Sequence, residues 1–181
     1  MMKTLGILLF ALTMSCTSLY AQKIPKGNLT YCSIVDEGVA HLGTDIGILT
    51  AEPDKIPTIK VTLYENCHFQ DATHGEYEVS PQVVKDLQKL IDNTKVYKVD
   101  GYDDEEGIDG GHEYSIKVIY DTGENIFAQW HTTSPNPIAR DAFHQLNMFF
   151  NPWYEKLKNG ITTEKLPNVS TSPQKKKARP D

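Results

Sequence analysis

The sequence lacks the short motifs that mark the commoner enzyme classes. It has no G-x-S-x-G nucleophile elbow, no H-E-x-x-H zinc motif, no G-x-x-x-x-G-K phosphate loop and no G-x-G-x-x-G dinucleotide fingerprint. Each motif fixes a reacting or phosphate-binding group at a set spacing. Without them the sequence predicts no cofactor and gives no direct ground for predicting an enzyme.

Long apolar runs are also missing beyond the first few residues. Residues 5–14 are apolar, but a ten-residue helix rises only about 15 Å, half the hydrocarbon core of a bilayer. Lys3 precedes this run, and small or polar residues follow it up to "SLYAQ". This pattern predicts a secretory signal peptide over residues 1–21, cleaved after Ala21. We therefore expect an exported protein, periplasmic or extracellular, with no transmembrane span.

Cysteine is scarce, with three in the chain. Cys16 ends the stretch "LTMSC", which resembles a bacterial lipobox except that Thr13 stands where an apolar residue is usual; a lipid anchor on Cys16 is therefore the alternative to cleavage after Ala21. Export favours a Cys32–Cys67 disulfide, which would close a loop of about 35 residues and contribute about 3 to 4 kcal/mol. Two buried free thiols are the alternative.

Positive charge is scarce in the body of the chain. Residues 22–163 contain 12 Lys and Arg against 22 Asp and Glu, whereas residues 164–181 contain five against two. An acidic body repels nucleic acid and anionic lipid, so neither is an expected partner. The basic end is rich in Pro, Ser, Thr and Lys, and we expect a disordered tail over 164–181, with an electrostatic tether as the alternative. Residues 22–163 are predicted to form a single domain.

An acidic, glycine-rich segment, "GYDDEEGIDGGHEYSI" at residues 101–116, suggests a metal loop at first sight. Its acids and glycines do not fit the spacing of a calcium EF-hand, so no metal site is predicted. A loose cluster would use the weak candidates Asp103, Asp104, Glu106 and Asp109. The stretch "HFQDATHGE", which holds His68, His74 and Glu76, matches no zinc spacing and is predicted to be a loop.

Hydrophobic periodicity predicts an α+β fold. Strands are expected over 28–35, 46–50 and 57–64, and a helix over 81–93 that Ser80 can cap. A second helix is expected to begin near Pro137 and to break at Pro152. The predicted architecture is a small antiparallel sheet with two main helices packed on one face.

The segment "EYSIKVIYDTGENIFAQWH" predicts a hairpin. A three-residue loop with Gly123 in its left-handed position opposes Tyr114 with Trp130, and continues with Ile116 opposite Ala128 and Val118 opposite Ile126. This register puts an apolar side chain opposite an apolar side chain in each of these three pairs, on the face predicted to pack on the helices. The other face would carry the following candidate binding residues: Lys117, Phe127, Gln129 and His131. Glu113 falls opposite His131, an arrangement more typical of an ion pair than of a catalytic base.

Residues 87–150 resemble an uncharacterised family of secreted and envelope-associated bacterial proteins. In that family a helix leads to a W-x-G-[FY] turn, then to a D-G-x-x-[FY]-S-[LI]-x-[IV]-x-Y-x-x-G-x-x-I-x-A hairpin and a closing helix. The matching residues are Gly101-Tyr102, Asp109-Gly110, Tyr114-Ser115-Ile116, Val118, Tyr120, Gly123, Ile126 and Ala128. Val99 stands where the family has the tryptophan. The resemblance implies the hairpin and the α+β class, and it implies no activity.

Charge and the absence of motifs together favour a non-catalytic binding or inhibitory module of the cell envelope. An acidic surface attracts cations, so the expected partner is a protein, and a basic one such as a lysozyme-like hydrolase would suit this charge. The alternatives are a small envelope hydrolase whose residues are scattered in the sequence, and a structural domain that packs on another protein.

Overall fold

The computed structural model describes residues 24–38, 44–64, 72–104, 112–131 and 136–166. Its elements in chain order are β1 (Leu29–Glu37), β2 (Asp45–Thr50), β3 (Thr58–Tyr64), β4 (Ala72–Glu78), α1 (Pro81–Thr94), the 3-10 helix η3 (Val96–Val99), β5 (Tyr102–Asp103), β6 (Glu113–Tyr120), β7 (Asn125–His131), α2 (Pro137–Lys158) and β8 (Thr163–Glu164). The three strands predicted before the first helix are confirmed as β1, β2 and β3. β8 extends one residue into the predicted tail, and residues 167–181 lie outside the described ranges.

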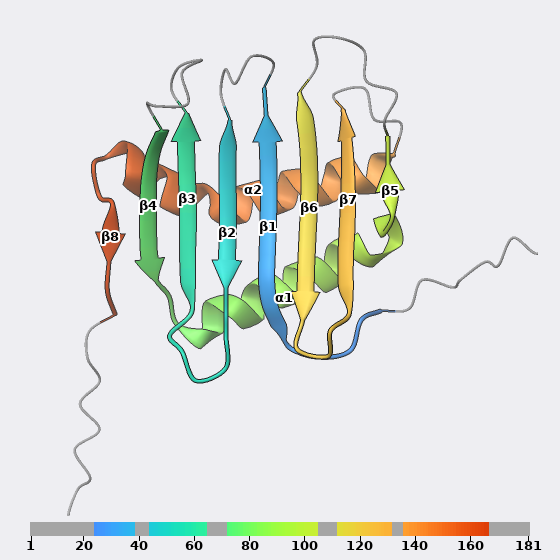
Figure 1. Cartoon of the computed structure of the whole chain (residues 1–181), viewed down its shortest axis with the longest axis horizontal. Coiled ribbons are helices and arrows are strands. Elements are labelled where there is room, and N and C mark those ends of the chain that lie inside the picture. Colours follow the sequence, from blue (N-terminus) through green and yellow to red (C-terminus); the bar gives the residue numbers. More distant parts are fainter. Residues whose placement is uncertain (1–23, 39–43, 65–71, 105–111, 132–135, 167–181) are drawn as a thin grey trace, which may run out of the picture.

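The described strands form one eight-stranded sheet in the order β5-β7-β6-β1-β2-β3-β4-β8 (Figure 1). β1 and β6 lie side by side in its middle, although they are far apart in the sequence. Most neighbours are antiparallel, but the edge pairs β4–β8 and β5–β7 are parallel. The α+β class is therefore confirmed, whereas the prediction of a small antiparallel sheet is wrong because the sheet is large and mixed.

Three strands account for this difference. The sequence of β4 shows no apolar alternation and therefore predicts a loop. In the structure this segment is a strand in which only Gly75 and Tyr77 are buried. β5 and β8 have two residues each, too few to give a periodic signal. Their pairing depends on the free N–H and C=O groups that β7 and β4 offer at the edges of the sheet.

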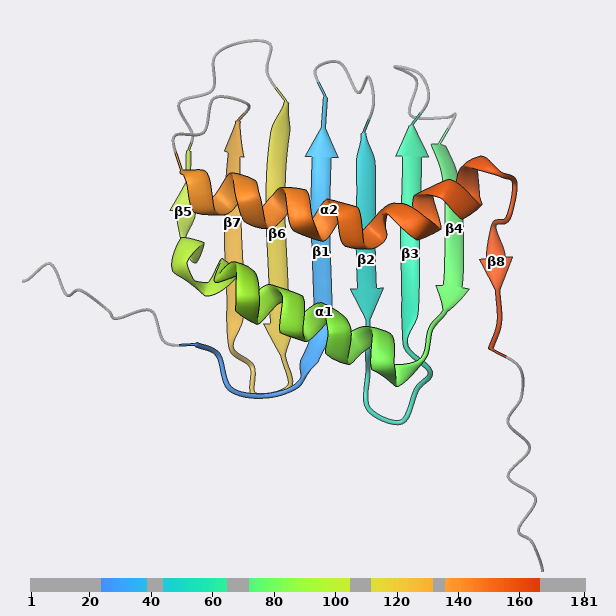
Figure 2. The ribbon, with the colours of Figure 1, turned by 180° about the vertical axis from the view of Figure 1, so that it is seen from behind.

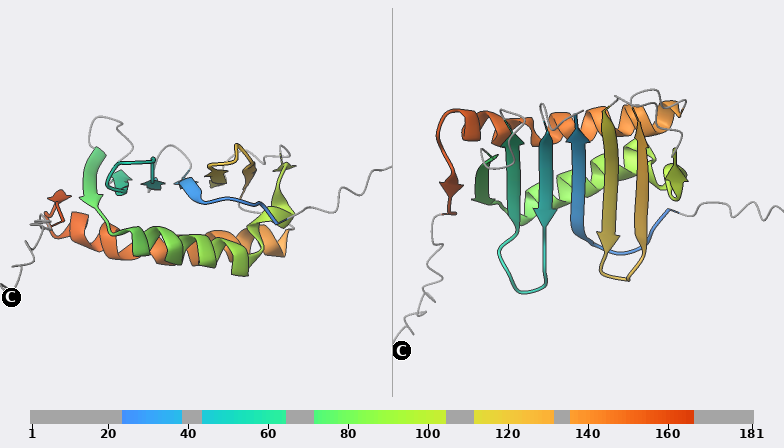
Figure 3. Two further views of the ribbon diagram at one scale, coloured as in Figure 1. Left: turned by 90° about the horizontal axis from the view of Figure 1, so that it is seen from below. Right: turned by 45° about the horizontal axis from the view of Figure 1, so that its top comes forward.

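Both helices cover the same face of the sheet, as predicted (Figure 2). Seen along the layer in Figure 3, they lie on one side of the strands, and α2 runs across the sheet from the β5 end to the β8 end. α1 confirms the predicted helix and packs through Leu87 and Ile91, which are 0% and 1% exposed. Ser80 occupies the N-cap position, but its side chain makes no capping hydrogen bond.

The helix α2 is continuous through Pro152, so the predicted break is wrong. Its N-terminus is capped by Asn136, whose side chain accepts hydrogen bonds from two backbone N–H groups of the first turn. Aromatic side chains on both sides of the proline contact each other: the rings of Phe149 and Trp153 lie 5.5 Å apart. Phe150 and Tyr154, on either side of the proline, are 0% and 3% exposed, so packing in the core stabilises the helix across the missing hydrogen bond. Within the described ranges, no helix has both the length and the apolarity needed to cross a membrane.

The hairpin of β6 and β7 has the predicted register. Tyr114 pairs with Trp130, and the pairs Ile116–Ala128 and Val118–Ile126 follow. Gly123 has φ of 83°, and the N–H of Tyr120 donates to the carbonyl of Glu124 at 3.0 Å, which closes the three-residue loop. A left-handed glycine was needed here because other residues rarely adopt this conformation.

The core lies between the helices and the covered face of the sheet. The largest side chains that are fully buried there are Tyr77, Tyr120, Phe150, Leu29, Ile34, Leu49, Ile59, Leu87, Ile91, Ile116, Ile126 and Leu146. Gly47 in β2 provides space for one of them, since a Cβ at this position would lie 2.7 Å from the ring of Phe150.

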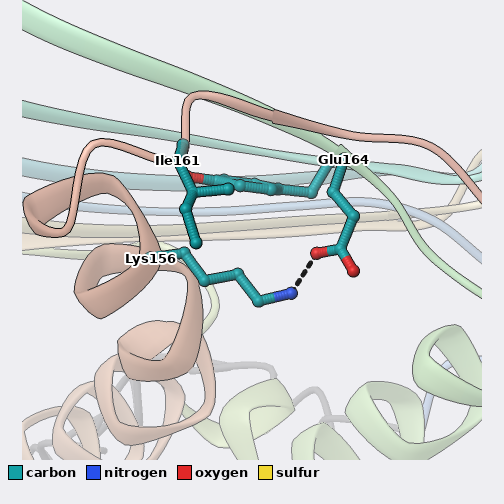
Figure 4. A network of polar contacts seen from close by, with 4 residues as sticks. Lys156, Ile161 and Glu164 are labelled. Carbon is teal, nitrogen blue, oxygen red and sulfur yellow. Dashed lines mark hydrogen bonds and ion pairs between the residues drawn. The ribbon is translucent and has the colours of Figure 1, made fainter.

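The end of the chain that follows α2 is tied to the edge strand β4. The hydroxyl of Tyr77 donates to the carbonyl of Ile161 at 2.5 Å, and Lys156 forms an ion pair with Glu164 (Figure 4). Burial, and secondarily the charge of Glu164, raises the pKa of Tyr77, which keeps its hydroxyl a donor. These contacts hold β8 beside β4.

Candidate functional site

The four predicted binding residues lie together on the helix-free face of the sheet. Lys117 pairs with Phe127, and Gln129 and His131 follow along β7. They alternate with the buried residues of the hairpin, so their side chains point away from the helices, and Phe127 is 41% exposed. Glu113 is opposite His131, as predicted, although no hydrogen bond or ion pair joins the two in the described part of the chain.

Apolar side chains continue across this face beyond the hairpin. Strand register places them next to one another: Val35 faces Ile46, and Tyr31 faces Ile119. With Phe127, the partly exposed apolar residues of the helix-free face are Tyr31, Val35, Ile46, Ile48 and Ile119. Sequence reasoning found only the part of this surface that belongs to β6 and β7, because the neighbours of the other strands depend on the strand order.

The weak metal candidates do not form a site in the described residues. Asp103 accepts a hydrogen bond from Gln129 Nε2 at 2.9 Å, and the backbone N–H of Asp104 donates to the Gln129 carbonyl at 3.2 Å. Glu106 and Asp109 lie outside the described ranges. Among the residues that can be searched, no three His, Cys, Asp or Glu side chains lie close enough together to bind a metal.

The histidine-rich stretch contributes to a strand and not to the predicted loop. His74 Nδ1 lies 3.0 Å from Thr62 Oγ1, and Glu76 forms an ion pair with Lys60 at 3.5 Å. These are contacts between neighbouring strands on the helix-free face. His68 lies outside the described ranges.

Cys32 is a free thiol that is 0% exposed on the covered side of β1. Burial raises the pKa of this thiol to about 12. Cys67 lies outside the described residues, so the structure does not support the predicted Cys32–Cys67 disulfide. Cys16 and Ala21 also lie outside them, and the signal peptide and its lipoprotein alternative stay predictions.

A second candidate site, which the sequence did not indicate, is a cleft of about 260 Å³ between the first half of α2 and the ends of β1, β6 and β7. The residues that line it are Asp36, Tyr114, Trp130, Arg140, Phe143, His144 and Asn147. Three aromatic rings form its apolar wall. Tyr114 lies edge-on to Phe143 at 5.0 Å and is stacked on Trp130 at 5.9 Å.

Asp36 belongs to the sheet wall of this cleft, on the covered face of β1. Its carboxylate Oδ1 is 2.8 Å from His112 Nδ1, and its side chain is 24% exposed. The imidazole of His112 is in turn stacked on Tyr114, with the ring centroids 6.0 Å apart. The histidine therefore fixes both the carboxylate and one aromatic wall.

A second carboxylate, Asp45, lies beside Asp36 because the two residues pair across β1 and β2. Burial raises the pKa of Asp45, the charge of Asp36 raises it further, and Lys158 opposes the shift. Burial and these same two carboxylates raise the pKa of Tyr154 on α2. The Tyr154 hydroxyl has no hydrogen-bond partner among the described residues. Polar groups are thus gathered beneath α2, where a simple core would be apolar.

The described lining of the cleft has no Ser, Thr or Cys, and its ionisable side chains are Asp36, Arg140, His144 and Tyr114. It presents one carboxylate, one guanidinium, one imidazole and one amide beside aromatic rings, the mixture that small-molecule sites use to orient a ligand. One signal in the sequence could have revealed it: Asp36 continues the buried alternation of Cys32 and Ile34, so a charge is placed on the covered face.

A comparison with protein-family models gives no match for this chain, and a comparison with curated proteins gives no similar sequence.

Proposed function

We propose that this protein is an exported binding module that holds a basic protein partner on the helix-free face of its sheet. The observation that carries the proposal is the packing of both helices on one side of an eight-stranded sheet (Figure 3). The described residues place no element over the other side. Inhibition of an envelope enzyme is one result such binding would have.

The apolar side chains on this face support a protein contact. Val35 is paired with Ile46 and Tyr31 is paired with Ile119, whereas Ser33 and Lys117 lie between Ile48 and Phe127 in the row that joins those two residues. Each Å² of apolar surface that a partner removes from water contributes about 25 cal/mol to the free energy of binding. Apolar patches of this kind on a folded domain commonly mark interaction surfaces.

Charge on this face supports a basic partner. The outward positions of the described strands carry two lysines, Lys60 and Lys117. The carboxylates at such positions are Glu37, Glu76, Glu78, Asp103 and Glu113. An excess of carboxylates around an apolar centre attracts cationic proteins over a distance and speeds their association, mainly at low salt.

The test is a matched pair of substitutions that each shorten one exposed apolar side chain. Phe127→Ser changes the helix-free face, whereas Met148→Ser changes α2, where Met148 is 60% exposed. Wild type and both variants are immobilised and offered the envelope fraction, and the retained protein is identified, purified and titrated.

We expect a basic protein to be retained by wild type and by Met148→Ser. Phe127→Ser is expected to raise its Kd at least tenfold while the melting temperature stays unchanged. Equal affinity of the two variants, or a partner that is not basic, would overturn the proposal.

A further inference from the structure

We propose that the cleft beneath α2 binds a small zwitterion with an apolar side chain, of the amino-acid or short-peptide class. The cleft lies beside α2. Both helices lie on one side of the sheet (Figure 2), opposite the face that is proposed to hold a protein partner. The two proposals therefore rest on different residues and fail independently.

The volume of the cleft limits the ligand. At about 260 Å³ it lies below the range of about 300 to 1,000 Å³ that is typical of sites for drug-sized molecules. A single amino acid or a dipeptide fits that scale, whereas a longer peptide or a folded segment would have to extend out of the cleft.

Two opposite charges on two separate walls select a dipolar ligand. Arg140 is on the α2 wall and Asp36 is on the sheet wall, and no ion pair joins them among the described residues. A guanidinium holds a carboxylate through two parallel hydrogen bonds, and a carboxylate accepts from an ammonium group. A ligand with only one charge would be attracted by one wall and repelled by the other, so a zwitterion is favoured.

The groups around Asp36 prepare it for this role. His112 Nδ1 is 2.8 Å from one carboxylate oxygen and restricts the side chain to one orientation. The other oxygen makes no hydrogen bond to a described residue. A carboxylate that is already positioned loses less conformational freedom when it binds a ligand.

The aromatic wall favours the side chain of the ligand over a sugar ring. Trp130 and Phe143 are 3% and 7% exposed, so their broad faces are covered and cannot stack on a saccharide. Only Tyr114 offers a larger part of its ring. Edges of rings make an apolar contact that an alkyl or phenyl side chain can use.

Residues one and two turns after Arg140 complete the α2 wall. His144 and Asn147 follow it at i+4 and i+7, so all three lie on one stripe of the helix. They supply hydrogen-bonding groups that can orient the backbone of an amino acid or peptide.

Calorimetric titration of the whole chain tests the proposal with defined probes. The probes are L-phenylalanine and L-phenylalanyl-L-alanine, each with its N-acetyl derivative, which lacks the ammonium group, and its amide, which lacks the carboxylate. We expect at least one parent compound to bind and each of its derivatives to bind at least tenfold more weakly. The parent that binds tells an amino-acid site from a dipeptide site.

Two variants assign the charges to the walls. Arg140→Gln is expected to weaken the binding of the parent compound at least tenfold and to make it bind no more tightly than its amide. Asp36→Asn should make the parent compound bind no more tightly than its N-acetyl derivative. Asp141→Asn is the control, because Asp141 is exposed on α2 outside the lining and contacts Gln145.

Thermal melting establishes that each variant is folded before it is titrated. Absence of binding by both parent compounds at millimolar concentration would overturn the proposal. So would equal binding of the derivatives, or affinity that is unchanged in both Arg140→Gln and Asp36→Asn.

Discussion

At the scale of single residues, two positions that matter for core packing hold small side chains without reactive chemistry. Gly47 leaves space for the ring of Phe150, and Cys32 fills the centre of β1 as a small apolar side chain would. Asp36 and its neighbour Asp45 are the exceptions, because they place carboxylates on the covered face. The first two are chosen by their fit to the core, whereas Asp36 costs desolvation and makes sense as part of a site.

Cys32 is expected to be unreactive in the folded protein. Its thiol is 0% exposed and burial raises its pKa to about 12, so almost no thiolate exists at neutral pH. In a Cys16→Ser, Cys67→Ser variant, a chromogenic disulfide reagent at pH 8 should detect no reactive thiol in the folded protein. After denaturant is added it should detect one thiol per chain. Rapid reaction of the native variant would contradict the buried position.

The same thiol predicts a pH dependence of stability. Its pKa is higher in the folded chain than in the unfolded chain, so between about pH 9 and 12 the unfolded state loses the proton first and stability falls as pH rises. Denaturation at pH 8 and pH 10.5 should show a smaller fall for Cys32→Ala than for the parent. Equal falls would remove Cys32 as the cause.

At the scale of elements, tertiary packing overrides local signals. β4 has the sequence of a loop but pairs along its whole length with β3. α2 continues past a proline that normally ends a helix, because aromatic residues before and after it pack together. Local propensity was a good guide only where it agreed with burial, as it did in the hairpin of β6 and β7.

Replacing the proline tests how much strain α2 carries. Pro152→Ala restores an N–H to the helix, which is worth about 3 kcal/mol, and makes the unfolded chain more flexible, which costs about 1 kcal/mol. We expect the free energy of unfolding to rise by about 2 kcal/mol in urea denaturation. Asn151→Ala is the control, because Asn151 is a neighbouring exposed residue of the same helix and should change stability by less than about 0.5 kcal/mol. A loss of stability in Pro152→Ala would show that the proline is required by its packing.

At the scale of the whole molecule, the fold is a two-layer structure with different properties on its two faces. The covered face holds the core and the charged cleft, and the other face holds apolar strands bordered by carboxylates. A ligand and a protein partner could therefore bind at the same time without contacting the same residues. The central strands carry both faces, and the two-residue strands β5 and β8 form the edges.

This arrangement predicts a gradient of hydrogen exchange. β1 is paired on both sides and its covered side chains Cys32 and Ile34 are 0% and 1% exposed, so its amides should exchange only on global unfolding, about 5 to 15 kcal/mol for a domain. β8 is paired on one side only and should open at a much lower free energy. Native-state exchange in low denaturant measures both. Equal protection of β1 and β8 would show that the edge unfolds only with the core.

The sequence by itself determined the features that depend on near neighbours. Alternation and one loop length were enough for the register of β6 and β7, and helical spacing was enough for α1, because these signals lie within a few residues. The same signals correctly placed Lys117, Phe127, Gln129 and His131 on the face without helices.

Only the tertiary structure decided which strands are neighbours, and with them the sites. Asp36, Tyr114 and Arg140 are separated by long stretches of chain and come together because β1 pairs with β6 while α2 crosses above. Such contacts depend on the order of strands and on the path of one helix, which no local period encodes. The cleft is therefore a property of the packed chain, whereas the outward residues of the hairpin are a property of the sequence.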